Sequence, residues 1–346
     1  MNEKNEKKER LVLDVAYQPQ VKTGFDTQRI MLTVIIALLP AVIVSVIQYG
    51  YYPLCVIGVS AASCVFFEWI YRLLMKKNCT VGDLSAVVTG MLLAMVLPAG
   101  IPLWVPVIGA FFAIVVVKQL YGGIGKNFLN PALAGRAFLL ASYAMLMGKW
   151  VTPKSLSGVV DTVTMATPLS YLYGGKALPE YFGKLELFLG NRPGCIGELS
   201  TLAVLIGAAI LLFFKVIDWR IPVSTVGTVA VLTLIFGKSG YGNFDWMVYN
   251  LLTGGLMFGA VFMATDYATS PVSAKGRLLY GFGIGALTVL IRYFGGYPEG
   301  ISYAILIMNL CSWAIDKAFH RHQFGVTRAE LKAEKAAAKA AKGAAK

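Results

Sequence analysis

Residues 30–48 read IMLTVIIALLPAVIVSVIQ, an apolar run without a charged residue. A helix needs about 20 apolar residues to cross the hydrocarbon core of a bilayer, so this run predicts a transmembrane helix. No small-residue cleavage site follows it, and we expect no removable signal peptide. Nine further runs are also predominantly apolar: 54–75, 84–98, 101–117, 131–147, 199–215, 220–236, 249–264, 277–293 and 300–316.

The composition agrees with a membrane protein. Of the 346 residues, 57% are hydrophobic and only 14% are charged, whereas about a quarter of a soluble domain is charged. The net charge of +13 comes from Lys and Arg placed beside the apolar runs and in the two tails, which is typical of topology determinants and not of a nucleic-acid-binding surface. We therefore predict an all-α polytopic membrane protein with about ten transmembrane helices.

The loop charges predict the orientation. With the N-terminus inside, the inside segments hold 23 of the 31 Lys and Arg residues. Positive charge accumulates on the cytoplasmic side of membrane proteins. We therefore expect a cytoplasmic arm (1–29), a cytoplasmic Ala/Lys-rich tail (317–346) that touches anionic lipid, and an extracytoplasmic loop at 148–198.

The apolar runs divide into two groups of five, 30–147 and 199–316. Short sequence echoes connect the groups: Thr89-Gly90 with Thr253-Gly254, and Gly122-Gly123 before Asn130-Pro131 with Gly295-Gly296 before Tyr297-Pro298. Because five is odd, the second group would enter the membrane from the opposite side. This predicts two inverted five-helix repeats. The alternative is chance, because Gly and Pro are common in membrane helices.

Two polar segments near the predicted cytoplasmic side are candidate binding sites. In residues 118–131, Gly123 and Asn127 belong to a Gly-rich stretch before a helix start. Its backbone N–H groups would cradle a phosphate or a polar ring system, or form only a tight turn between helices. Asn130-Pro131 is typical of a helix start. In residues 263–271, Asp266 lies at a membrane boundary, where an acid either helps an ion to pass or caps the following turn.

The third segment is DTVTMATPL, residues 161–169, in the long loop. It has no His, no Cys and no base beside a nucleophile, so it is not catalytic. Thr167 is preceded by an acid six residues earlier (Asp161) and a hydroxyl three residues earlier (Thr164). Thr265, in the other Met-Ala-Thr copy, lacks both and lies on the inside. We interpret the segment as an extended, accessible attachment site; the alternative is an ordinary loop.

Residues 161–169 resemble the flavinylation motif of the D subunit of the Rnf electron-transport complex and of the homologous B subunit of the sodium-translocating NADH:quinone reductase. Within this motif the acid falls on Asp161, the Ser/Thr on Thr164, the Ala on Ala166 and the final Thr on Thr167. Met165 departs from the Gly that is frequent there. The chain length favours the Rnf protein. Further blocks are similar to the same family, and together they cover most of residues 30–316: 122–132, 262–271 and 295–300 with Asn309.

The resemblance implies FMN, phosphoester-linked to Thr167 by a flavin transferase. It also implies a second, non-covalent flavin (riboflavin), whose neighbourhood we place near Gly123 and Asn127. The chain would be one subunit of a complex in a bacterial or archaeal cytoplasmic (inner) membrane. With other membrane and peripheral subunits, it would couple electron transfer between ferredoxin and NAD to Na⁺ or H⁺ translocation.

No complete active site is expected in this chain alone, because it shows no catalytic constellation and no nicotinamide site. Its five cysteines form no CxxC and no Cys/His cluster, so we expect neither a metal nor an iron–sulfur centre held by this chain alone. The alternative functions are a stand-alone transporter or channel and a structural subunit that only holds partners together.

Overall fold

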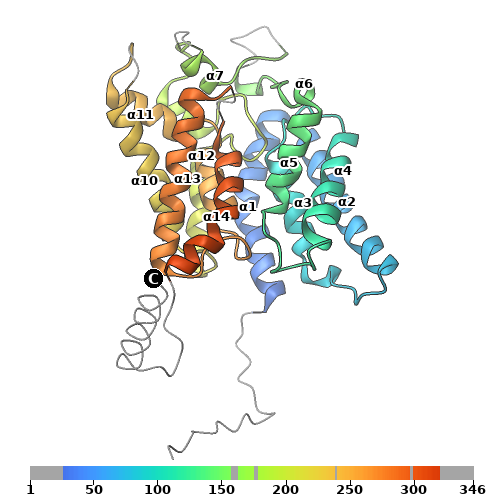
Figure 1. Ribbon diagram of the computed structural model, residues 1–346. Coiled ribbons are helices and arrows are strands. Elements are labelled where there is room, and N and C mark those ends of the chain that lie inside the picture. Colours follow the sequence, from blue (N-terminus) through green and yellow to red (C-terminus); the bar gives the residue numbers. More distant parts are fainter. Residues whose placement is uncertain (1–25, 157–162, 175–177, 238–239, 297–298, 320–346) are drawn as a thin grey trace, which may run out of the picture.

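The computed structural model describes residues 26–156, 163–174, 178–237, 240–296 and 299–319. Its helices stand side by side in one bundle (Figure 1). Helix α1 begins and helix α14 ends at one end of the bundle, and the short helix α7 lies at the opposite end. The described residues contain helices and only two isolated β-bridges. The all-α prediction is confirmed.

Each of the five apolar runs of the first group contains a helix. Helix α4 continues directly into a π-helix, a form that often marks functional sites. The elements are α1 (Thr27–Tyr49), α2 (Tyr52–Leu74), η1 (Val81–Asp83), α3 (Ser85–Met95), α4 (Trp104–Phe111), η2 (Phe112–Gln119), α5 (Pro131–Ser142) and α6 (Ala144–Met147).

The second group also places a helix in every run. Within the part of the chain that the structure describes, three helices (α1, α2 and α13) are long and apolar enough to cross a membrane, and a bent pair adds a fourth if it counts as one span. The elements after α6 are η3 (Lys154–Leu156), α7 (Pro168–Tyr173), α8 (Lys184–Leu189), α9 (Thr201–Phe213), α10 (Arg220–Ile235), α11 (Asn243–Leu252), α12 (Leu256–Phe258), η4 (Gly259–Met263), α13 (Ala274–Phe294) and α14 (Ile301–Ala318).

The bent pair differs from the predicted span 249–264. Its helix begins earlier, at Asn243, and bends by 61° between α11 and the following α12–η4 segment. Gly254 and Gly255 lie at the break with φ of +69° and +65°, where a side chain would be strained. The buried Arg292 of α13 donates to the carbonyls of Asn250 (2.7 Å) and Thr253 (3.0 Å). It thereby satisfies acceptors that the end of α11 leaves open.

The sequence echoes have different local structures. Thr89-Gly90 lies inside the continuous helix α3, whereas Thr253-Gly254 lies at the break. Gly90 allows α2 and α3 to touch, since a Cβ there would lie 2.6 Å from the Ala61 Cα. Such close approach is typical of small residues between membrane helices. Tyr297 and Pro298 lie outside the described residues.

Candidate functional site

Thr167 is the N-cap residue of helix α7 and lines a cavity. Its backbone is extended (φ −69°, ψ 151°), and its Oγ1 accepts a hydrogen bond from the Ser170 N–H at 3.3 Å. The Ser170 hydroxyl lies 2.9 Å from the same oxygen. Pro168 follows at the first helical position, where its missing N–H is harmless. The backbone is extended as predicted, but the Thr167 hydroxyl is not freely accessible, because the residue is only 8% exposed.

The residues before Thr167 pair with the chain on the other side of the loop. Thr164 forms an antiparallel bridge with Val151, and the Met165 N–H donates to the Trp150 carbonyl at 3.0 Å. Thr164 and Ala166 are exposed and Met165 is half-buried. Asp161 lies outside the described residues. This pairing fixes the approach of the chain to Thr167.

The cavity beside Thr167 encloses about 830 Å³ of non-protein space, part of it open to the surroundings. The walls come from α5, α6, α7 and the start of α14 and are mainly apolar, with two aromatic residues. The lining residues are Arg136, Ala137, Leu140, Ala144, Met147, Gly148, Trp150, Thr167, Ser170, Glu299, Gly300, Ser302 and Tyr303. We call this space the Thr167 cavity.

Arg136 and Glu299 form an ion pair in the wall of the Thr167 cavity. Arg136 also donates to the Ser302 hydroxyl, and its Nη2 lies 3.6 Å from the Cys195 Sγ. Cys195, Glu198 and Glu299 bring possible metal-ligand atoms within 4.8 Å of one another. The cation that contacts two of these three residues is the Arg136 guanidinium itself.

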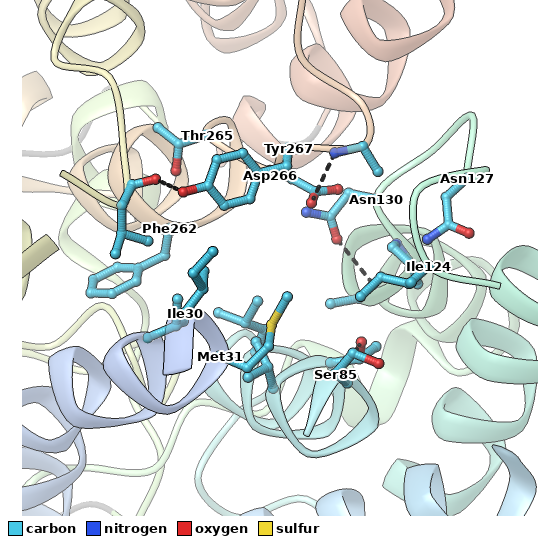
Figure 2. A pocket seen from close by; sticks show the side chains of 18 of the residues that line it. Ile30, Met31, Ser85, Ile124, Asn127, Asn130, Phe262, Thr265, Asp266 and Tyr267 are labelled. Atoms are coloured by element: carbon cyan, nitrogen blue, oxygen red, sulfur yellow. Dashed lines mark hydrogen bonds between the residues drawn. The ribbon is translucent and has the colours of Figure 1, made fainter. Parts of the chain in front are cut away.

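A second cavity lies near the starts of α1 and α5 and encloses about 810 Å³ of non-protein space. Figure 2 shows Asn127, Asn130 and Asp266 on its polar side, and Phe262, Ile30 and Met31 on its apolar side. Asn127 and Asp266 come from the two segments singled out in the sequence. The structure therefore brings two separately predicted residues to one space, which we call the Asn127 cavity.

The polar groups of the Asn127 cavity are largely buried. Asn127 is 8% exposed, and its Oδ1 has no hydrogen-bond partner among the described residues. Asn130 caps α5, as predicted, by accepting from the N–H groups of Ala132 (3.1 Å) and Leu133 (3.3 Å). Asn127 therefore lines the cavity with a buried acceptor that no described residue uses.

The structure shows the capping role of Asp266. Its carboxylate accepts from the Ala268 N–H (3.5 Å) and the Thr269 hydroxyl (3.2 Å), so it does cap the following turn. It also lines the Asn127 cavity. Capping and a place in the cavity wall are therefore compatible at this residue.

Gly123 has a different place from Asn127. It has φ of +92°, and a Cβ would lie 2.7 Å from the Arg72 Nη2. Its N–H donates to the Lys118 carbonyl at 3.0 Å. Gly123 thus shapes the turn after η2, while the adjacent Ile124 lines the cavity. For this residue, the geometry is that of the tight-turn alternative.

The buried charges were missed in the sequence. Arg136 lies within the apolar run 131–147, and Glu68 lies within 54–75. The available signal was a charged residue inside a predicted span, because burial of a charge in the membrane costs free energy unless the charge is paired or functional. The partners Glu299 and Lys118 stand 163 and 50 residues away, so the pairing itself could not be found.

Comparison with known proteins identifies the family. The model of the NQR2, RnfD, RnfE family matches residues 14–325. The D subunit of the Na(+)-translocating ferredoxin:NAD(+) oxidoreductase complex of Acetobacterium woodii is 44% identical over 94% of this chain and 99% of its own. The proton-translocating counterpart of Clostridium ljungdahlii is 41% identical over 92% and 97%. The B subunit of the Na(+)-translocating NADH-quinone reductase of Chromohalobacter salexigens is 42% identical over 72% and 62%. The chain belongs to the NQR2, RnfD, RnfE family, as the resemblance predicted.

Proposed function

We propose that this chain is the D-type membrane subunit of an ion-translocating ferredoxin:NAD oxidoreductase complex, and that it carries FMN on Thr167. Family membership and the names of its full-length relatives support the complex. The observation that carries the flavin is the cavity beside Thr167. Thr167 lines this mainly apolar cavity, so a ring system linked to its Oγ1 would lie within it.

The residues of the Thr167 cavity fit a flavin. The Thr167 hydroxyl would form the phosphoester, while Trp150, Tyr303 and the aliphatic side chains of α5 and α6 would contact the ring. Arg136 adds a buried cation whose Nε has no partner among the described residues. Bound FMN would supply electron transfer, which no side chain of this site provides.

The buried hydroxyl adds a condition for attachment. Thr167 is 8% exposed and caps α7, so a flavin transferase cannot reach its Oγ1 while α7 packs in this way. Attachment would therefore take place when α7 is displaced, and packing of α7 would then bring the flavin into the cavity.

We propose that the Asn127 cavity holds the non-covalent flavin, riboflavin. The unpaired Asn127 Oδ1 and the apolar wall at Phe262 support this assignment. Asp266, which lines the same cavity, is the proposed ion-path residue. The relatives differ in the ion that their names give, Na⁺ or protons, so the ion of this chain is either of the two.

The helix arrangement supports the proposed ten-span, inverted-repeat topology. Helices α1 and α9, the first of each group of five, pack against each other. Helix α2 packs on α3 and α4, and α10 packs on α11 and α13. The common end of α1 and α14 would be cytoplasmic, and the loop 148–198 with α7 would be extracytoplasmic (Figure 1).

Covalent attachment is tested by flavin fluorescence of the chain after SDS gel electrophoresis, when it is expressed with its flavin transferase. We expect a fluorescent band that is lost in Thr167→Ala. Ser170→Ala is the matched control, because it removes the neighbouring hydroxyl and must keep the band. Fluorescence that survives Thr167→Ala would contradict the attachment site. Solute flux through liposomes that contain only this chain, without bound flavin, would instead favour a stand-alone transporter.

A further inference from the structure

We propose that Arg136, positioned by Glu299, sets the redox potential of the flavin on Thr167 by holding a buried positive charge against it. This inference rests on the proposed function. It assigns Arg136 a tuning role beyond that of a structural ion pair within the bundle.

Arg136 is buried in the wall of the Thr167 cavity. Arg136 lies in the middle of α5, is 6% exposed and lines the Thr167 cavity. It pairs with Glu299 and donates to the neutral Ser302 hydroxyl. Its Nε has no partner among the described residues. Neighbouring side chains therefore hold the guanidinium charge in the cavity wall, and its effect on a ligand in the cavity is electrostatic.

The lining of the Thr167 cavity contains few charged groups. Among its described lining residues, Arg136 and Glu299 are the only charged ones. A flavin ring gains negative charge when it accepts an electron, and charged groups near the ring change how easily this happens. The remaining lining residues are neutral, so Arg136 and Glu299 are the charged groups of the wall itself, and they act in opposite directions. The buried Glu198 carboxylate, which has an oxygen within 4.8 Å of the Glu299 carboxylate, adds a negative charge that stays the same in all the variants.

The sign of the effect follows from this geometry. Loss of the Arg136 charge makes reduction harder and lowers the midpoint potential. Loss of the Glu299 charge makes reduction easier and raises it. A unit charge at the wall of a partly buried site changes the reduction equilibrium roughly tenfold to hundredfold. For one electron, this corresponds to about 60–120 mV at 59 mV per tenfold change.

The test is a redox titration of the purified full-length chain with its covalent flavin. The titration of Thr167→Ala is subtracted to remove any non-covalent flavin. The variants are Arg136→Gln, Arg136→Lys, Glu299→Gln and the double variant Arg136→Gln/Glu299→Gln. We expect Arg136→Gln to lower the potential and Glu299→Gln to raise it, each by the amount above. Arg136→Lys and the double variant should stay near the wild type.

A purely structural ion pair predicts a different pattern, in which both single variants shift the potential in the same direction or leave it unchanged. Either pattern would overturn the proposal. Arg136→Gln leaves Glu299 buried and unpaired and risks misfolding. If the Arg136→Gln protein does not accumulate, the potentials of Glu299→Gln and Arg136→Lys still test the proposal. A midpoint potential that fails to rise in Glu299→Gln contradicts it.

Arg192→Gln is the matched control. Arg192 is also a buried arginine, 4% exposed, but it does not line the Thr167 cavity. A shift as large as that of Arg136→Gln would show a general effect of buried charge and overturn the assignment. In-gel fluorescence separates the two proposals: a wild-type chain without a fluorescent band refutes the flavin attachment, whereas a fluorescent chain with unchanged potentials refutes only the tuning role.

Discussion

Replacement of Lys118 by Met should strongly destabilise the bundle. Lys118 lies near the end of the π-helix η2, and its Nζ lies 2.7 Å from the Glu68 Oε2 of α2 and 2.6 Å from the Ser85 Oγ of α3. The two charged side chains are only 2% and 1% exposed. The ammonium group therefore joins three elements beside the Asn127 cavity, and a methionine at this position would lose all of these bonds.

The magnitude follows from the partner that remains. After the change, Glu68 keeps only the Thr80 hydroxyl at 2.7 Å among the described residues. Removal of one partner of a buried ion pair costs about 3–5 kcal/mol, because the other charge stays buried without compensation. Replacement of both charges by uncharged groups of similar volume is often neutral or stabilising. The double variant Glu68→Gln/Lys118→Met should thus recover most of the loss.

The assay is thermal unfolding of the purified chain in detergent, with Lys126→Met as the matched control. Lys126 is an exposed lysine that follows η2, and its loss should change the unfolding temperature little. The expected order is wild type and Lys126→Met highest, the double variant close below, and Lys118→Met clearly lowest. A Lys118→Met chain as stable as the Lys126→Met chain would refute the account of this ion pair.

Two further changes test the packing and the surface charges. Gly90→Leu should push α2 and α3 apart, because even a Cβ at this position would lie 2.6 Å from the Ala61 Cα. We expect less folded protein in size-exclusion chromatography. Gly227→Leu is the control and should be tolerated, because a Cβ there would meet nothing within 4 Å. Asp218→Asn should lower the free energy of unfolding by about 1 kcal/mol, because Asp218 forms ion pairs with both Arg220 and Arg277. Burial raises the pKa of Asp218, but hydrogen bonds from the Arg220 N–H and from the side chains of Arg277 and Arg220 together hold that pKa below its ordinary value. Asp218 therefore contributes its full share to the free energy of unfolding above the ordinary pKa of about 3.9, and this share is lost as the pH falls through the lower pKa of the folded state. If the difference in unfolding free energy between wild type and Asp218→Asn grows as the pH falls, this reasoning is wrong.

The helices could be predicted because lipid-spanning segments need long apolar runs. Each of the ten predicted runs contains a helix, with ends near those expected in most cases. The exception is 249–264, where the helix starts at Asn243. Trp246 lies before the predicted run, yet it belongs to α11 and is buried, and its indole N–H donates to the Tyr293 hydroxyl. Tertiary packing, which a single run of sequence does not reveal, decided this boundary.

The candidate sites were only partly visible in the sequence. Thr167 was found from its local motif, and Asn127 and Asp266 from polar character near membrane boundaries. That Asn127 and Asp266 share one cavity depends on the packing of segments far apart in the chain. The pairing of Arg136 with Glu299 depends on the same kind of long-range contact. The burial of the Thr167 hydroxyl was not expected, because it results from the docking of α7 and not from the motif.

The central claim is that Thr167 carries FMN, and mass spectrometry of one peptide tests it most directly. Cleavage after Lys154 and Lys176 releases residues 155–176, which contain Thr162, Thr164 and Thr167. In the chain coexpressed with its flavin transferase, this peptide should gain the mass of an esterified FMN, and fragmentation should place that mass on Thr167. An unmodified peptide, or a flavin mass on another residue, would contradict the account.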